Sequence, residues 1–136
     1  MVDALRRAHR MVRLAGFVVD LHPTAEIATV EVGAHSSGRI EGGDAPLRHA
    51  AADAALATAL DAGLFAVDAA VEFTFYTYGD TIDELRDYIA DNWRNARIDE
   101  TVVERTRDLL RGAPGTRPRV RESVRLTRLH PIASAK

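Results

Sequence analysis

The sequence predicts a single domain of the α/β or α+β class, built on a mixed sheet of about five strands with helices. Three observations carry this prediction. The chain has 136 residues, close to the commonest size of one compact domain. Apolar residues make up 46% of it, as in an ordinary globular protein. Segments of helical and strand periodicity follow one another in the order α-β-β-β-α-β-α-α-β.

The first helix and the first strand are predicted within residues 1–21. Apolar positions recur near the helical period from Val2 through Leu5 to Val12, so residues 1–14 are predicted as an amphipathic helix. Residues 17–21 form a nearly continuous apolar run, which is typical of a strand buried on both faces. Pro23 ends this strand because proline has no N–H to donate to a ladder.

A hairpin and a long helix are predicted next. Residues 26–41 alternate and then turn at residues 33–38, which predicts an inserted hairpin whose second strand covers residues 38–41. Asp44 is the predicted N-cap of a helix with Pro46 in its first turn, where the missing N–H costs little. The helix is rich in alanine and is expected to run to about residue 62.

The second half of the chain predicts two strands flanking a pair of helices. Residues 69–78 alternate as a strand. Thr81 and Glu84 form a capping box that starts a helix, and a second helix starts at residue 99 or 101. Residues 119–129 alternate as the final strand, and the helical pair between the two strands favours antiparallel pairing of these strands.

Composition excludes several classes of function. The chain has no cysteine, which excludes disulfides, thiolate metal sites and a cysteine nucleophile. The formal net charge of −2 gives no pull toward nucleic acid, so a nucleic-acid partner is not expected. No apolar run approaches the ~18 residues of a membrane helix, and the N-terminus has no signal-peptide pattern. These features predict a cytoplasmic protein without a membrane partner.

Asp20 and His22 are the candidate catalytic residues. Residues i and i+2 of a strand point to the same face, so both side chains are expected to project together at the end of the first strand. A carboxylate beside an imidazole suits acid–base chemistry. The alternative is a histidine that only closes a His-Pro turn. No two histidines have the spacing of a local metal clip, so no metal site is predicted.

Tyr76, Tyr78 and Trp93 are the candidate ligand-binding residues, because their rings could stack on a flat ligand. The alternative is that these rings complete a core or a dimer interface. The C-terminal segment is also rich in arginine, and this basic segment could meet phosphates or form ion pairs with Asp and Glu. Its cationic residues are Arg117, Arg119, Arg121, Arg125 and Arg128.

Residues 4–13, Ala-Leu-Arg-Arg-Ala-His-Arg-Met-Val-Arg, lead into Gly-Phe-Val-Val-Asp-Leu-His-Pro at residues 16–23. This stretch resembles the helix and fifth strand of class I S-adenosylmethionine-dependent methyltransferases. Residues 69–78 then correspond to strand six, and residues 119–131 are similar to the last strand of that family. The resemblance covers the C-terminal half of the family fold, with residues 26–41 as an insertion. Leu14-Ala15-Gly16 replaces the usual Pro-Gly-Gly turn.

The resemblance implies that the cofactor-binding half of the fold is absent, so no cofactor is predicted for the isolated chain. S-adenosylmethionine is expected only if another chain supplies the missing half. The edge of the strand at residues 17–21 would then be bare, which predicts a homodimer through the first helix and strand, or a separate partner chain. Three hypotheses follow: a non-catalytic methyltransferase-like domain acting by dimerisation or ligand binding, a subunit or truncated form of a methyltransferase, and a small acid–base enzyme using Asp20 and His22.

Overall fold

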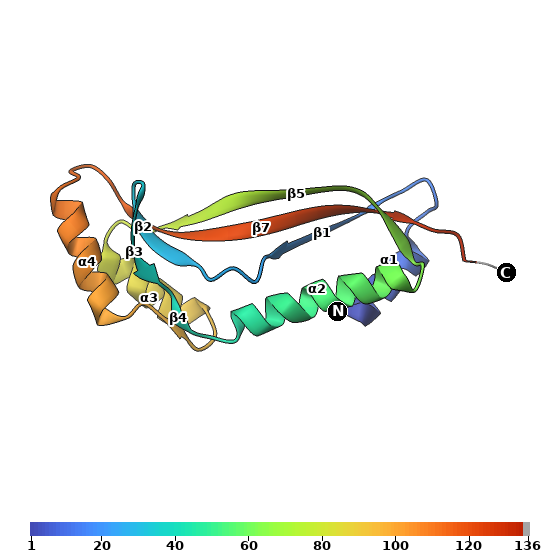
Figure 1. The fold of residues 1–136 in the computed structure, drawn as a ribbon, viewed down its shortest axis with the longest axis horizontal. Helices are drawn as coiled ribbons and strands as arrows, with labels where there is room; N and C mark the ends of the chain where they lie inside the picture. The colour runs from blue at the N-terminus through green and yellow to red at the C-terminus, as the bar shows by residue number, and fades with distance from the viewer. Residues whose placement is uncertain (135–136) are drawn as a thin grey trace. The chain divides into compact units, whose positions relative to one another are not determined.

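A computed structural model describes residues 1–134 and has the α+β class that the sequence predicts. The described residues contain four helices and a mainly antiparallel five-stranded sheet, in the predicted order of elements (Figure 1). Two further strands of two residues each, β4 and β6, pair with one another in a small second sheet. The elements are α1 (Val2–Met11), β1 (Val18–Pro23), β2 (Thr29–Val32), β3 (His35–Arg39), β4 (Glu41–Gly42), α2 (Ala45–Asp61), β5 (Phe65–Tyr78), α3 (Ile82–Asn92), β6 (Ala96–Arg97), α4 (Glu100–Arg111) and β7 (Pro118–Pro131).

The last strand, β7, organises the main sheet. It pairs antiparallel with β1 along its C-terminal part and antiparallel with β2 along its N-terminal part. Strand β3 continues the sheet beyond β2, and β5 also pairs with β7. The pairing of β5 with β7, the two strands that flank α3 and α4, was expected from the sequence. None of the helices in residues 1–134 is long and apolar enough to cross a bilayer.

The chain divides into two compact units, and the long strands β5 and β7 contribute to both. The first unit contains Met1–Thr24, Leu47–Phe73 and the chain from Val124 onward. Here α1 and α2 lie on one side of the strands (Figure 1). Its core joins Leu5 of α1 and Leu56 of α2 to Phe65 and Leu129 of the strands. The predicted apolar side of α1 therefore packs on this unit's own core, because Val12 contacts the same cluster.

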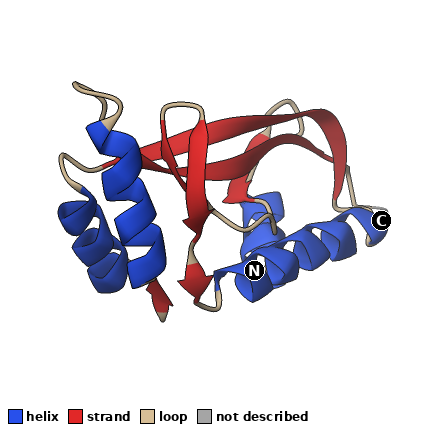
Figure 2. Ribbon diagram, turned by 60° about the vertical axis from the view of Figure 1, so that its left-hand side comes forward, coloured by secondary structure: helices blue, strands red, loops and turns tan. Residues whose placement is uncertain are grey.

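The second unit contains Ala25–Pro46 and Thr74–Ser123. Helices α3 and α4 pack beside one another within it (Figure 2). The predicted cap of α3 is confirmed, since Thr81 accepts a hydrogen bond from the Glu84 amide. Asp99 likewise caps α4 by accepting from the Thr101 amide. The core of this unit is formed by α3, α4 and the strands: Val30, Ile40, Ile82, Leu85, Ile89, Ala96, Ile98, Val102, Val103 and Val120.

The hairpin differs from its predicted form. Its second strand was expected at residues 38–41, but β3 covers His35–Arg39. Gly33 takes a φ of +58°, which only glycine adopts at little cost, so the chain turns immediately after β2 and returns at His35. The pairing of β2 with β3 then shifts register between Val30 and Glu31. Residues 41–42 instead form β4, which pairs with β6.

Glu122 of β7 is expected to affect the stability of the fold in a pH-dependent way. Its side chain is half buried, and burial raises the pKa of this carboxyl above its usual value of 4.5. A raised pKa in the folded chain stabilises the fold below pH 4.5, and this contribution is lost as the pH rises through the folded pKa. We therefore expect Glu122→Gln to raise the melting temperature at pH 7 and to have a smaller effect at pH 4.

Thermal unfolding followed by circular dichroism at both pH values checks this expectation. Glu104→Gln on α4 is the matched control, because Glu104 is exposed. This control is expected to shift the melting temperature equally little at both pH values. An equal effect of Glu122→Gln at pH 4 and pH 7 would contradict the role assigned to its burial.

Candidate functional site

Asp20 and His22 converge, as their spacing in a strand predicts. The Nδ1 atom of His22 lies 2.6 Å from Oδ2 of Asp20, and the two side chains are only 9% and 10% exposed. Both project from β1 toward α2, because the other ring nitrogen of His22 meets a residue of that helix. His22 Nε2 lies 2.6 Å from Oδ1 of Asp53. The imidazole is therefore held between two carboxylates.

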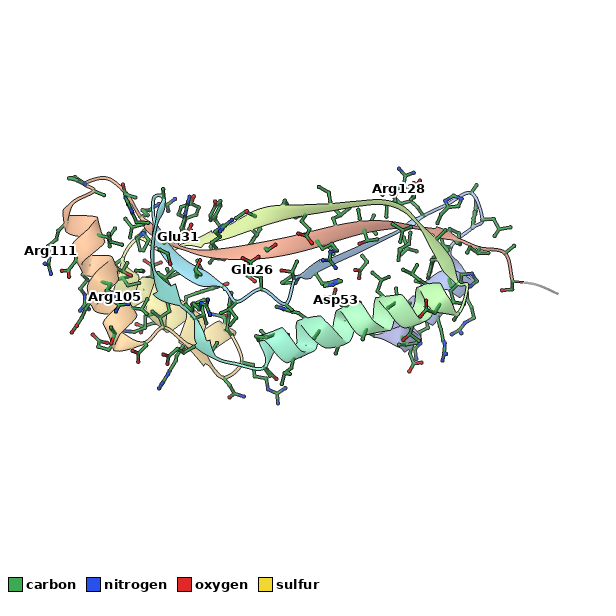
Figure 3. The ribbon with its side chains drawn as sticks, in the orientation of Figure 1. Glu26, Glu31, Asp53, Arg105, Arg111 and Arg128 are labelled. Carbon is green, nitrogen blue, oxygen red and sulfur yellow. The ribbon has the colours of Figure 1, made fainter. Side chains whose placement is uncertain are left out.

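Helix α2 positions Asp53, and Figure 3 shows this side chain directed from the helix toward the strands. His49 lies one turn earlier on the same helix, since residues four apart share a face. Its Nδ1 atom lies 3.0 Å from the carbonyl oxygen of Thr24. Partial burial lowers the pKa of His49 below 6.5, with the charge of Arg48 acting in the same direction. The His49 side chain is therefore mainly uncharged at pH 7.

Arg125 and Glu72 complete the polar cluster from β7 and β5. Arg125 is the pairing partner of His22 across the two strands. Its guanidinium donates to Asp53 Oδ1 at 3.4 Å and to Glu72 Oε1 at 2.7 Å and 3.1 Å. The hydrogen bond to Glu72 raises the pKa of Arg125 further above its usual value. Three carboxylates thus face one guanidinium and one imidazole.

Thr127 lies beside this cluster, and its side-chain hydroxyl is buried without a hydrogen-bond partner in the described residues. It pairs with Asp20 across β1 and β7, and strand alternation places it on the same side as Arg125. Thr127 is only 3% exposed, and its Oγ1 atom has no hydrogen-bond partner among the described residues. A buried hydroxyl without a partner costs free energy of folding. Thr127 is therefore a candidate binding residue.

Sequence reasoning found two of these residues and missed the others. Asp53 had a local signal, because it lies in the middle of an alanine-rich helix, four residues after His49. Glu72 and Arg125 lie in strands that were predicted correctly, and Arg125 was noted as part of the basic segment. Their meeting depends on the pairing of β1, β7 and β5, which no spacing along the chain reveals. Thr127 had no signal at all.

The aromatic candidates are only partly brought together. The rings of Tyr76 and Tyr78 lie 6.2 Å apart in the second unit. Arg119 covers the Tyr76 ring at 3.9 Å, and Arg117 lies 4.9 Å from the Tyr78 ring centroid. Trp93 instead packs against the helical core, and in the described residues no ring contact joins it to either tyrosine. Guanidinium groups therefore occupy the ring faces on which a flat ligand would stack.

Four of the five arginines of the basic C-terminal segment are paired with acids. Arg117 contacts Asp80, Arg119 contacts Glu31, and Arg128 contacts Asp68. Arg125 belongs to the polar cluster already described. Arg119 also donates to the Gly33 carbonyl oxygen and to the Tyr78 hydroxyl. These pairs use the arginine charges within each unit.

A second candidate surface lies on the opposite side of β1 and β7 in the first unit. Asp20 and His22 face α2, so alternation directs Val19 and Leu21 away from the helices. Val71 and Phe73 of β5 are also exposed. We call Phe17, Val19 and Leu21 the outer apolar face.

The outer apolar face is both exposed and continuous. Its three side chains are between 48% and 58% exposed. Leu126 of β7 pairs with Leu21, which extends the face onto the neighbouring strand. Arg128 lies over the Phe17 ring at 4.4 Å and contacts Asp68, and Figure 3 shows it projecting away from α2. The face is therefore an apolar surface with a charged border.

No family model, curated protein or solved structure matches this chain. Among residues 1–134, no group of three or more His, Cys, Asp or Glu side chains is placed to hold a metal ion. The polar cluster and the outer apolar face are therefore the two candidate functional features of the chain.

Proposed function

We propose that this chain is a non-catalytic, methyltransferase-like domain that acts by assembly, and that two copies associate through the outer apolar face. The observation that carries the proposal is the exposure of three large apolar side chains on one side of the chain at residues 17–21. Soluble monomers rarely expose a continuous apolar patch above a few hundred Å². The face contributes about 300 Å² if each of its large side chains exposes about half of its surface.

The size of the face suits the centre of a dimer interface. A standard interface covers about 800 Å² per partner, with an apolar centre and a polar rim. Arg128 and Asp68 supply charged groups at the border of the face. A two-fold dimer brings the same patch of both copies together, and an apolar patch is complementary to itself.

The β1 strand supports the same proposal. In the described residues β1 pairs with β7 along one edge only. The resemblance to methyltransferases implies a further strand beside this one, and a second copy or a separate chain would take its place. Because α1 packs on its own core, the proposed interface lies on the outer apolar face instead of the first helix.

Size-exclusion chromatography with light scattering tests the proposal. We expect the parent chain to be a dimer at micromolar concentration and Leu21→Glu to be a monomer, because a buried unpaired charge opposes association. Leu47→Glu is the matched control, since Leu47 is exposed on α2 of the same unit. This control should remain dimeric. A parent chain that is monomeric at micromolar concentration would contradict the proposal.

A separate chain that supplies the missing half of a methyltransferase would need the same face. Calorimetry with S-adenosylmethionine separates this alternative from a non-catalytic role. We expect no heat of binding for the isolated chain, because none of its residues matches a cofactor motif. Micromolar binding of S-adenosylmethionine by the isolated chain would favour a methyltransferase subunit.

A further inference from the structure

We propose that the polar cluster of Asp20, His22 and Asp53 is an acid–base site that binds and protonates a small amine between Asp20 and Thr127. This inference does not depend on the proposed dimer, because all the residues concerned belong to one unit of one chain. The first evidence for it is the pair of short hydrogen bonds formed by the His22 ring. A contact of 2.6 Å between a ring nitrogen and a carboxylate oxygen needs a hydrogen atom between them.

Each side of the His22 ring therefore holds one proton. One lies between Nδ1 and Asp20 Oδ2, and the other lies between Nε2 and Asp53 Oδ1. Asp20 is nearly buried, whereas Asp53 is about one-third exposed. The three side chains thus connect a buried carboxylate to a carboxylate that meets water, with the His22 ring between them.

The buried end of this connection has hydrogen-bonding capacity that the chain does not use. Thr127 pairs with Asp20 across the strands, and its buried hydroxyl has no partner in the described residues. Its oxygen accepts N–H groups, as does the Asp20 carboxylate. A donor bonded to both would satisfy the Thr127 hydroxyl. This unpartnered group separates the cluster from an ordinary buried ion pair.

Charge selects the kind of ligand. The carboxylates of Asp20, Asp53 and Glu72 face the cluster from β1, α2 and β5. Opposing them are Arg125 from β7 and the His22 ring, with His49 as a further neighbour on α2. Three carboxylates against the Arg125 guanidinium and the doubly protonated His22 ring leave one negative charge, which favours a cationic guest. A primary amine fits, because it becomes a compact cation with N–H donors.

The proton transfer balances within these groups. The nitrogen lone pair of a neutral amine takes the proton held between Asp20 Oδ2 and His22 Nδ1. The new ammonium ion then donates to Asp20 and to Thr127 Oγ1. The proton held at Nε2 stays on the ring, which becomes neutral. When the amine leaves, the ammonium ion returns its proton to His22 Nδ1, so no further proton source is needed. No bond other than these N–H and O–H bonds forms or breaks.

Methylamine hydrochloride is the probe, added at constant pH and ionic strength to the ¹⁵N-labelled full chain. We expect saturable changes in the ring ¹⁵N signals of His22, with a dissociation constant of about 1 mM. Tetramethylammonium chloride is the matched salt, and it should leave these signals unchanged because it has no N–H group. Absence of a saturable change with methylamine, or an equal change with tetramethylammonium, would overturn the proposal.

Thr127→Val is the decisive variant because it removes only the unpartnered hydroxyl. We expect this variant to melt at a higher temperature than the parent, since no hydrogen bond is lost and a buried polar group is removed. It should nevertheless bind methylamine about tenfold more weakly, which corresponds to one hydrogen bond to a charged group. Thr58→Val on α2 is the control, because its hydroxyl bonds its own helix. Equal binding by Thr127→Val and the parent would exclude the assigned position.

Discussion

Replacement of His22 by alanine is expected to destabilise the chain by about 3–5 kcal/mol, the range measured when one partner of a buried ion pair is removed. The ring bridges two carboxylates at 2.6 Å on each side. Without it, Asp20 keeps a nearly buried negative charge and loses its short hydrogen bond. Asp53 then faces the same space with the same sign of charge. The melting temperature should fall by roughly 10 °C or more.

His130→Ala is the matched control for this prediction. His130 lies in β7 of the same unit and is exposed, so its removal should change stability by at most about 0.5 kcal/mol. Urea unfolding followed by circular dichroism measures both variants. A loss for His22→Ala as small as that for His130→Ala would mean that the two short contacts contribute nothing.

The sign of a second substitution separates a charge effect from a cavity. Asp20→Asn should destabilise the parent, because it weakens the hydrogen bond to His22 Nδ1. In the His22→Ala background the same change should stabilise the chain, since it removes the uncompensated buried charge. The two residues are in contact, so their effects are not expected to add. Purely additive losses would point to packing alone.

Local patterns were sufficient to predict most of the fold. The capping box at Thr81 and Glu84 located the start of α3, because this signal depends on residues three apart. The alternation of residues 69–78 located most of β5, although that strand starts earlier, at Phe65. Residues 65–68 lack clear alternation, so their strand conformation follows from pairing with β7. Local signals predict elements well when the interactions that form them are local.

The candidate site could be predicted only in part from the sequence. The i, i+2 spacing of Asp20 and His22 predicted that they meet, because strand geometry fixes that relation. Asp53 reaches His22 from 31 residues away, and Arg125 reaches Asp53 from 72 residues away. Such contacts depend on strand order and on the seating of α2 against the sheet. The outer apolar face could not be predicted for the same reason, because an apolar strand has the same sequence pattern whether a helix or water covers it.

Gly38→Ala is expected to destabilise the second unit by about 2–4 kcal/mol, which combines backbone strain with overpacking. Gly38 lies in β3 with a φ of +152°, a conformation that residues with a Cβ rarely adopt. A Cβ atom built there would lie 2.5 Å from Cγ2 of Val102. Val102 is buried on α4 and β-branched, so it cannot rotate away without disturbing the core. The absence of a side chain at Gly38 therefore lets β3 approach α4.

Gly33→Ala separates the two contributions. Gly33 also has a positive φ, of +58°, but a Cβ atom there meets nothing within 4 Å. This variant should lose only about 1–2 kcal/mol, the cost of a left-handed alanine. Val102→Ala should then reduce the loss caused by Gly38→Ala, because it removes the methyl groups that the new Cβ would contact. If Gly38→Ala and Gly33→Ala were equally stable in urea, the close approach of β3 to α4 would carry no packing constraint.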